Sequence, residues 1–360
     1  MRTDPAAHFP AGYREGRAAF VEACGAADLG ITTRVHPAAK GPNGNALFID
    51  VACAGARDAD TALLLISGTH GVEGYFGSGA ITGLLREGLT ARLPRCAKAV
   101  LLHALNPYGF AWDRRVTEDN VDLNRNFVDH ANPPENAAYD ALASAIAPAD
   151  IAREAVKAAN AKLTAYARTH GDFALQEAIT RGQYRHADGL YYGGTRQAWS
   201  ALMLRDIVSE HLRGVARLIA IDFHTGLGAS GAAELIVESG PDTALYERAK
   251  AIWGRRVVSS QTGESLSAAL TGTIDAALPG LLPEAEVTVG ALEVGAQSLR
   301  DVFRALRQDN WLHRNGGLRN PRAAEIKAHI RAAFYPDTRA WKHAVWAAAD
   351  ETVGAALAVL

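Results

Sequence analysis

Residues 62–73 read ALLLISGTHGVE: an apolar run, a Ser-Gly-Thr turn and then a His-x-x-Glu pair. The apolar run predicts a buried strand, and the stretch from Tyr75 to Arg86 predicts a helix. His70 and Glu73 therefore stand where a strand turns into a helix. Imidazole and carboxylate groups are ordinary zinc ligands, and a catalytic zinc usually has three protein ligands and a water. A surface His and Glu beside a helix start would look the same, so the interpretation depends on a third ligand.

A third candidate ligand, His224, closes another apolar run. Residues 216–223 read ARLIAIDF, which predicts a buried strand, and His224 enters a turn that contains glycine. Ligand sites in open α/β sheets gather at the carboxyl ends of strands. Asp222 could support His224, because a metal-binding His usually donates its other N–H to a carboxylate or carbonyl. A purely structural His at a strand end is the alternative interpretation of this segment alone.

A loop rich in Arg and Asn follows the predicted strand at residues 98–105. It contains NPYGF at residues 106–110, then Arg114 and Arg115, then VDLNRNF at residues 121–127. A guanidinium group binds a carboxylate through two parallel hydrogen bonds, and a cation stabilises a developing oxyanion. The loop therefore fits an enzyme that acts beside a free carboxylate, although a solvated loop with incidental ion pairs has the same composition.

One acid, Glu293, interrupts the apolar run VTVGALEVG at residues 287–295. A buried carboxylate is costly unless it is paired or bound to a metal. Glu293 is therefore either a strand-edge residue that faces solvent or a functional acid. Burial would raise its pKa and suit it to general base catalysis near neutral pH.

These four segments, in this order, resemble the zinc carboxypeptidase (M14-like) superfamily. NPYGF and VDLNRNF look like the peptidase pattern, whereas VGALEVGAQSLR at residues 289–300 looks more like the aspartoacylase and succinylglutamate desuccinylase group. Residues 181–200, RGQYRHADGLYYGGTRQAWS, together with HGVEG and DFHTGLG, most resemble the DUF2817 branch. The resemblance runs from about residue 49 to residue 300.

The resemblance implies a site with one Zn²⁺ per chain. Its implied ligands are His70, Glu73 and His224. It further implies that Glu293 activates the attacking water and later protonates the leaving amine.

The resemblance also implies roles for the polar loop. Arg115 would polarise the scissile carbonyl, with Arg114 as its rival, and Asn124 and Arg125 would grip a substrate carboxylate. The peptidases carry a substrate-capping Tyr on a late loop, but residues 252–286 contain no Tyr. Thr271-Gly272-Thr273 is the candidate replacement, and the departure leaves the substrate class open.

Strands that alternate with helices predict a three-layer α/β/α architecture with a central mixed sheet. We expect a single domain over residues 1–360. Residues 135–183 are rich in Ala and poor in β-branched residues, which predicts a helical insertion of two or three helices. This insertion is either a packed layer or a wall over the site.

Composition narrows the partners and the compartment. The formal net charge of −2 argues against a nucleic-acid or anionic-membrane partner. Cys24, Cys53 and Cys96 show no C-x-x-C spacing, which favours a reducing compartment. Residues 1–16 lack the apolar stretch of a signal peptide, and no window approaches ~18 uninterrupted apolar residues. We expect a cytoplasmic protein and leave a homo-oligomer open.

The leading functional hypothesis is a zinc-dependent amidohydrolase that acts on a carboxylate-bearing substrate, as a metallocarboxypeptidase on peptides or small peptide-like molecules. An N-acyl amino acid deacylase, aspartoacylase-like, is the alternative, and a non-catalytic binding protein is a third hypothesis. The sequence has no G-x-S-x-G elbow, no Walker A motif and no His-Glu-x-x-His, so the corresponding chemistries are excluded.

Overall fold

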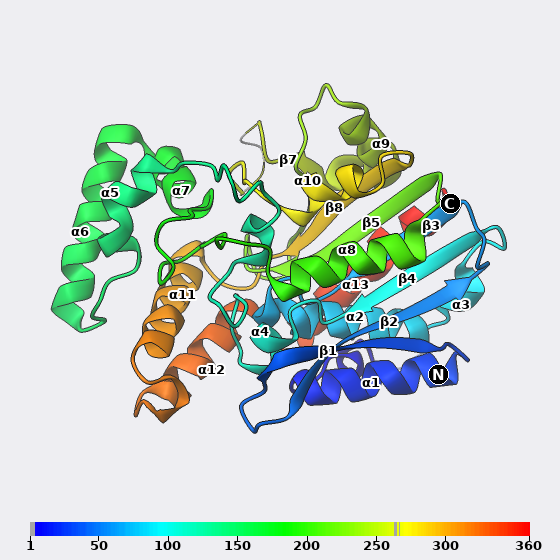
Figure 1. Cartoon of the computed structure of the whole chain (residues 1–360), viewed down its shortest axis with the longest axis horizontal. Coiled ribbons are helices and arrows are strands. Elements are labelled where there is room, and N and C mark those ends of the chain that lie inside the picture. Colours follow the sequence, from blue (N-terminus) through cyan, green and yellow to red (C-terminus); the bar gives the residue numbers. More distant parts are fainter. Residues whose placement is uncertain (1–3, 263–264, 266) are drawn as a thin grey trace.

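The computed structural model describes residues 4–262, 265 and 267–360. The first three residues of the segment used to argue against a signal peptide lie outside this part. The strands are β1 Ile31–Lys40, β2 Ala46–Gly55, β3 Thr61–Ile66, β4 Ala97–His103, β5 Arg217–Thr225, β6 Ala233–Val237, β7 Val257–Ser259 and β8 Glu286–Val294. They form one sheet in the order β1-β2-β4-β3-β5-β8-β6-β7 (Figure 1).

The sheet is mixed, as predicted. Strands β4, β3, β5 and β8 pair in parallel, whereas β1, β2 and β6 join through antiparallel pairs. The carboxyl ends of β3, β5 and β8 therefore meet at one edge. Leu63 and Leu65 belong to the apolar core on one face of the sheet, and Leu64 and Ile66 to the core on the other. This burial on both faces explains why β3 is a continuous apolar run.

Helices cover both faces of this sheet. They are α1 Tyr13–Ala26, α2 Gly74–Arg86, α3 Leu89–Arg92, α4 Pro107–Ala111, α5 Ala137–Ile146, α6 Arg153–His170, α7 Asp172–Thr180, α8 Trp199–Leu212, α9 Ala244–Trp253, α10 Ile274–Leu281, α11 Leu299–Arg314, α12 Ala323–Phe334 and α13 Arg339–Leu357. Helices α1, α2, α9 and α13 share one apolar core with the sheet, and α8 and α10 share the other. Figure 1 shows α8 in front of the strands and α13 behind them, which is the expected three-layer α/β/α arrangement.

The segment predicted as a helical insertion, residues 135–183, contains α5, α6 and α7. These helices stand to one side of the sheet (Figure 1) and share an apolar core with α11 and α12. Tyr139, Leu142, Val302 and Leu306 are members of that core. The insertion is therefore packed on the body, and its last helix also reaches the candidate site described below.

Several elements escaped the sequence patterns, among them β1, α9, α10 and α11. Strand β1 was not predicted because it lies at the sheet edge, is mostly exposed and so lacks apolar alternation. Helix α11 was also missed, since the sequence suggested helix only towards the end of residues 310–333. The buried face of α11 includes the polar residues Arg307, Asp309 and Asn310, which weakens its apolar periodicity. Among the described residues, no helix combines the length and hydropathy needed to cross a bilayer.

Helix α2 approaches the sheet so closely that it needs a glycine at Gly77. A Cβ atom there would lie 2.5 Å from the Cβ of Ser67 and 3.2 Å from the Cβ of Phe223. We predict that Gly77→Ala lowers the free energy of unfolding by about 1–3 kcal/mol through overpacking. Urea unfolding measures this change.

Gly25→Ala is the matched control. Gly25 lies in α1, and an added Cβ would meet no atom within 4 Å. This substitution should be neutral or stabilise the protein by up to about 1 kcal/mol, because alanine favours helix. Equal destabilisation by both substitutions would contradict the close packing of α2.

Candidate metal and substrate site

Three buried side chains converge at the carboxyl edge of the sheet. The potential ligand atoms of His70, Glu73 and His224 all lie within 4.8 Å of one another. His70 follows β3, Glu73 lies in the 3₁₀ turn Gly71–Glu73, and His224 is near the end of β5. Because β3 and β5 pair in parallel, their ends are neighbours. The structure thus brings together the three residues that the sequence suggested as metal ligands.

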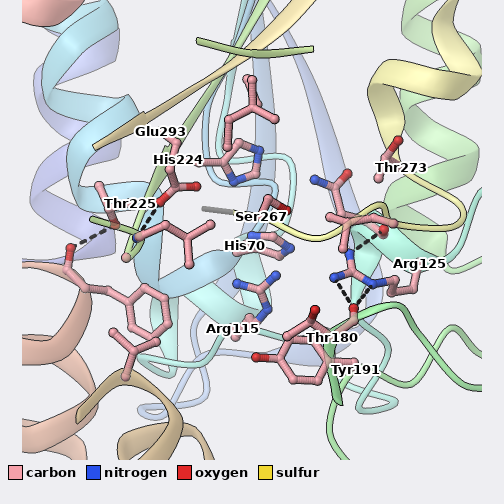
Figure 2. Close-up of a pocket in the computed structure, with 18 of the residues that line it drawn as sticks. His70, Arg115, Arg125, Thr180, Tyr191, His224, Thr225, Ser267, Thr273 and Glu293 are labelled. Atoms are coloured by element: carbon pink, nitrogen blue, oxygen red, sulfur yellow. Dashed lines mark hydrogen bonds between the residues drawn. The ribbon is translucent and has the colours of Figure 1, made fainter. Parts of the chain in front are cut away.

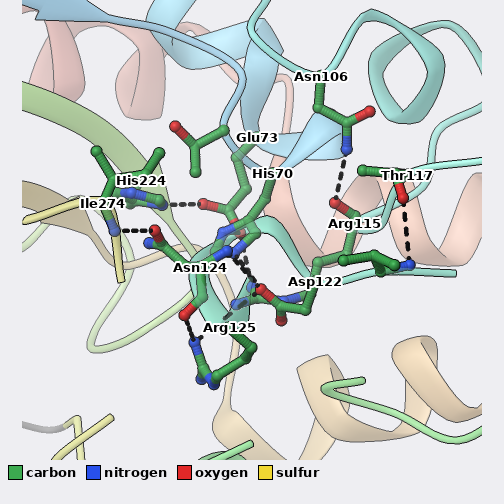
Figure 3. Close-up of polar contacts among 12 residues, drawn as sticks. His70, Glu73, Asn106, Arg115, Thr117, Asp122, Asn124, Arg125, His224 and Ile274 are labelled. Carbon is green, nitrogen blue, oxygen red and sulfur yellow. Dashed lines mark hydrogen bonds and ion pairs between the residues drawn. The ribbon is translucent and has the colours of Figure 1, made fainter. Parts of the chain in front are cut away.

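Each of the two histidines turns its Nδ1 atom towards Glu73 and its Nε2 atom towards an aspartate. Their Nδ1 atoms face Glu73, at 3.0 Å from Oε1 for His70 and 2.9 Å from Oε2 for His224. The Nε2 atom of His70 lies 3.0 Å from Asp122 Oδ1 (Figure 3), and that of His224 lies 2.8 Å from Asp222 Oδ2. An aspartate behind each ring is the usual support for a metal-binding His.

The chemistry of this donor set fits a zinc ion. The Nδ1 atom of His70 is buried and has no hydrogen-bond partner among the described residues, although Glu73 Oε1 is near. The two atoms are therefore close but not aligned with each other, as expected of groups that face a common point. Two imidazole nitrogens and a carboxylate are a ligand set that zinc enzymes use.

Asp122 links the candidate metal ligands to the polar loop, and the sequence had not singled it out. Besides His70, its carboxylate accepts hydrogen bonds from Arg115 Nε at 2.9 Å and from the amide of Asn124 at 3.1 Å. Burial opposes the charged form of Asp122, but the charges of Arg115 and His70 outweigh burial and hold its pKa well below the usual range. The local feature that could have pointed to Asp122 is that this acid directly precedes Leu123-Asn124-Arg125.

The structure distinguishes the two adjacent arginines. Arg115 Nη1 donates to Glu73 Oε1 at 2.9 Å, and Arg115 lines the same pocket as the two histidines. Arg114 instead donates from Nε to Asp309 Oδ2 at 3.1 Å and lines a different cavity. Of these two adjacent arginines, Arg115 is therefore the one that lies at the site.

Glu293 stands beside His224, because the two residues are paired in register on β8 and β5. Its side chain is buried and accepts a hydrogen bond from the amide of Leu227 at 2.9 Å. Burial, and then the charge of Glu73, raise the pKa of Glu293 to about 8. Of the two interpretations left open by the sequence, the structure excludes the solvent-facing one.

One pocket joins these groups (Figure 2). Six residues suggested by the sequence line it, namely His70, Arg115, Asn124, Arg125, His224 and Glu293, whereas Glu73 and Arg114 are not among its lining residues. Figure 2 shows the histidines and Glu293 towards one side of the pocket and Arg125 and Thr273 towards the other. The metal-ligand cluster and the candidate carboxylate-binding group thus face a common space.

Arg125 is held in place by backbone carbonyl groups. It is 1% exposed, and its Nε and Nη2 donate to the carbonyl of Thr180 at 2.9 and 2.6 Å. Its Nη1 donates to the carbonyl of Asn124 at 2.7 Å. These bonds use three of the five guanidinium N–H groups and leave two. Thr180 ends α7, so the helical insertion positions Arg125, a link that local sequence patterns do not reveal.

Tyr191 lies against both arginines of the pocket. Its ring centroid is 5.5 Å from the guanidinium carbon of Arg115 and 5.6 Å from that of Arg125. Its φ of +53° is left-handed, a strained conformation for a bulky residue that costs about 1–3 kcal/mol. Tyr191 thus forms part of the pocket wall.

The Thr271-Gly272-Thr273 segment has structural partners. Thr273 caps α10 by accepting a hydrogen bond from the amide of Ala276 and also lines the pocket. The carbonyl of Gly272 accepts a bond from the amide of Phe127 at 3.1 Å. The segment thus closes one wall of the site, beside the polar loop.

A family model described as "Protein of unknown function (DUF2817)" matches residues 9–348. The chain belongs to the DUF2817 family. No curated protein matches this DUF2817 chain.

Several solved structures are similar to this DUF2817 protein. Carboxypeptidase A from Helicoverpa armigera has a TM-score of 0.46 and 15% identity, over 91% of this chain and 75% of its own. A metallo-carboxypeptidase from Pseudomonas aeruginosa, in complex with (2-guanidinoethylmercapto)succinic acid, has a TM-score of 0.43 and 15% identity, over 96% and 71%. A succinylglutamate desuccinylase from Silicibacter has a TM-score of 0.41 and 15% identity, over 80% and 67%.

The charge network around Asp122 generates a stability prediction for the DUF2817 protein. We predict that Asp122→Asn lowers the free energy of unfolding by about 3–5 kcal/mol, because buried His70 and half-buried Arg115 each lose one of their two charged partners and keep only Glu73. Urea unfolding of chelator-treated protein measures this effect without a contribution from metal.

Asp119→Asn in the same loop is the matched control. Asp119 is exposed, and its ion pair with Arg196 is solvated. Its substitution should change the stability by no more than about 0.5 kcal/mol. A similarly small effect at Asp122 would show that its network is not a structural requirement.

Proposed function

We propose that this protein is a zinc-dependent amidohydrolase that cleaves an amide bond near a free carboxylate. The observation that carries the proposal is the convergence of His70, Glu73 and His224 at a strand edge, with Glu293 and Arg115 in the adjoining pocket. Three protein ligands are the number that leaves a zinc ion a position for chemistry. When bound there, zinc would supply a Lewis acid that activates water and polarises a carbonyl.

Glu293 is the proposed general base. The Leu227 amide holds one of its carboxylate oxygens, which leaves the other for the attacking water. Glu293 would take a proton from that water and later deliver it to the leaving amine. Its raised pKa suits both steps, because the group can accept and release a proton near neutral pH.

Arg115 is the proposed oxyanion-stabilising group. Its bonds to Glu73 and Asp122 fix the guanidinium and leave further N–H groups for substrate. A donor fixed in this way stabilises the charge that develops on the carbonyl oxygen without reorganising during the reaction.

Arg125 and Asn124 are the proposed carboxylate-binding residues. Because Arg125 is buried and held by backbone carbonyls, a carboxylate that reaches it must end the substrate molecule. This favours a metallocarboxypeptidase acting on peptides or small peptide-like molecules. An N-acyl amino acid deacylase would use the same groups and is the second candidate.

We also propose a cytoplasmic location. The three cysteines, Cys24, Cys53 and Cys96, are free, and the last two are exposed. Exposed free thiols suit a reducing compartment.

The test of this function compares zinc-loaded wild type with Glu293→Gln on three substrates: a blocked dipeptide, its C-terminal amide and an N-acyl amino acid. Wild type should release the terminal amino acid from the free acid and not from the amide. Glu293→Gln should keep its zinc and lose about 10²–10⁴-fold in kcat, because it lacks the base. Release from the N-acyl amino acid in preference to the dipeptide would identify a deacylase.

Glu286→Gln is the matched control, because Glu286 begins the same strand but is exposed. It should keep wild-type kcat. Near-wild-type kcat in Glu293→Gln would refute the base assignment, and equal cleavage of acid and amide would refute the carboxylate-binding role. Zinc-loaded protein that cleaves none of the three would favour a binding protein.

A further inference from the structure

An unpaired carboxylate, that of Asp275, lines the pocket in addition to the groups used above. Asp275 lies in the first turn of α10 and is 6% exposed. Within residues 4–262, 265 and 267–360, its side chain has no hydrogen bond and no ion pair. A buried carboxylate without a partner is costly. Its position in the pocket wall therefore calls for a specific explanation.

Helix capping does not explain Asp275. Acids are common in first helical turns because they interact with free amide groups there. In α10, however, the amide of Ile274 already donates to Asn124 Oδ1 at 3.0 Å. The amide of Ala276 donates to Thr273 Oγ1 at 3.2 Å, and that of Ala277 to the Thr273 carbonyl at 3.2 Å. Asn124 and Thr273 therefore accept the hydrogen bonds of these N-terminal amides, and Asp275 does not.

A second acid, Glu238, lines the same pocket. It follows β6, is half-buried and accepts a hydrogen bond from Ser260 Oγ at 2.7 Å. Burial, followed by the charges of Asp222 and Glu238, raises the pKa of Asp275. The two acids are therefore near enough to oppose each other's charge, and that repulsion is greatest when the pocket holds no cation.

The arginines of the pocket offset these acids only in part: burial raises the pKa of Glu238, and the nearby charge of Arg125 counteracts this without cancelling it. Arg115 is paired with Glu73 and Asp122, and Arg125 with the carbonyls of Thr180 and Asn124. Within the described part of the chain, no ion pair joins either arginine to Asp275 or Glu238. The pocket thus presents a candidate carboxylate-binding arginine and an acidic wall, Asp275 and Glu238, in which Asp275 has no ion pair within the described part of the chain.

We propose that the substrate carries an ammonium or guanidinium group that binds Asp275 and Glu238 while its carboxylate binds Arg125. The inference rests on the proposed function and names its substrate class: peptides or N-acyl compounds whose terminal residue is a basic α-amino acid. In such a residue the carboxylate and the cationic side chain diverge from one carbon. Thr273, two residues before Asp275, lies towards the same side of the pocket as Arg125 (Figure 2).

The same arrangement excludes acidic terminal residues. A terminal aspartate or glutamate would bring a second carboxylate against Asp275, where like charges repel in a buried setting. A cation there forms a charge-assisted hydrogen bond with a group that otherwise has no partner. Attraction for one class and repulsion of the other together produce specificity.

The test uses zinc-loaded protein and three blocked dipeptides: N-benzoylglycyl-L-lysine, N-benzoylglycyl-L-norleucine and N-benzoylglycyl-L-glutamate. Norleucine retains the chain of lysine and lacks the ammonium. Lysine should exceed norleucine by more than about tenfold in kcat/KM, the ratio expected of a buried charge pair, and glutamate should be poorest. In Asp275→Asn the lysine value should fall far more than the norleucine value. Glu238→Gln should give a smaller loss of the same sign, and Glu286→Gln should keep the wild-type preference.

Equal kcat/KM for lysine and norleucine in wild type, or an unchanged preference in Asp275→Asn, would overturn the inference. Thermal unfolding of Asp275→Asn, together with its remaining norleucine cleavage, shows whether the variant is folded. If Asp275→Asn does not fold, the loss of preference in Glu238→Gln decides the question in the same way.

A binding measurement separates this inference from the proposed function. Calorimetry would titrate free L-lysine, L-norleucine and L-glutamate into zinc-loaded wild type and Glu238→Gln. Tighter binding of lysine, weakened in the variant, supports the acidic wall even if no dipeptide is cleaved, and the absence of cleavage would count against the hydrolase alone. Binding of lysine no tighter than norleucine would overturn the inference whatever the activity.

Discussion

The carboxylate of Glu73 lies between two imidazoles, and the rest of the site is arranged around it. One oxygen faces His70 and accepts from Arg115; the other faces His224 and accepts from the amide of Thr225 at 3.1 Å. Burial opposes the charge of Glu73, but His70 and His224 outweigh burial and keep its pKa below the usual range. A buried charge of this kind is tolerated only with such partners, so the strands, turns and loops that supply the partners are constrained together.

The topology of the sheet brings the partners of Glu73 together. Strand β3 has β4 on one side and β5 on the other, so the chain leaves the end of β3 at a point where the direction of winding changes. Crevices at such points are the usual ligand sites of α/β sheets. His70 and Glu73 enter from the turn after β3, His224 from β5 and Glu293 from β8. The long polar loop after β4 then adds Asp122, Arg115 and Arg125.

Sequence patterns predicted what is local, and tertiary packing determined the rest. The His-x-x-Glu pair, the strand-end His224 and the acid Glu293 each stand out within a few residues, and the structure brings all of them together. Asp122 was not predicted because its partners His70 and Arg115 meet it only after folding. The carbonyl of Thr180, which holds Arg125, carries no side-chain signal at all.

Asp275 also could not be recognised from the sequence, because its local sequence context looks ordinary. In the sequence it follows Thr273-Ile274 at a helix start, where an acid needs no explanation. Only the fold shows that the amides of that helix are already bonded and that the carboxylate lines a pocket. The edge strand β1 was missed for a related reason, because an exposed strand at a sheet edge need not alternate apolar and polar residues.

We propose that His70, Glu73 and His224 bind one zinc ion. Calorimetric titration of zinc into chelator-treated protein tests it most directly, with His70→Ala beside His343→Ala, which changes an exposed histidine paired with Asp4. We expect about one zinc per chain in wild type and in His343→Ala, and loss of that zinc in His70→Ala. No zinc binding in wild type, or unchanged binding in His70→Ala, would contradict it.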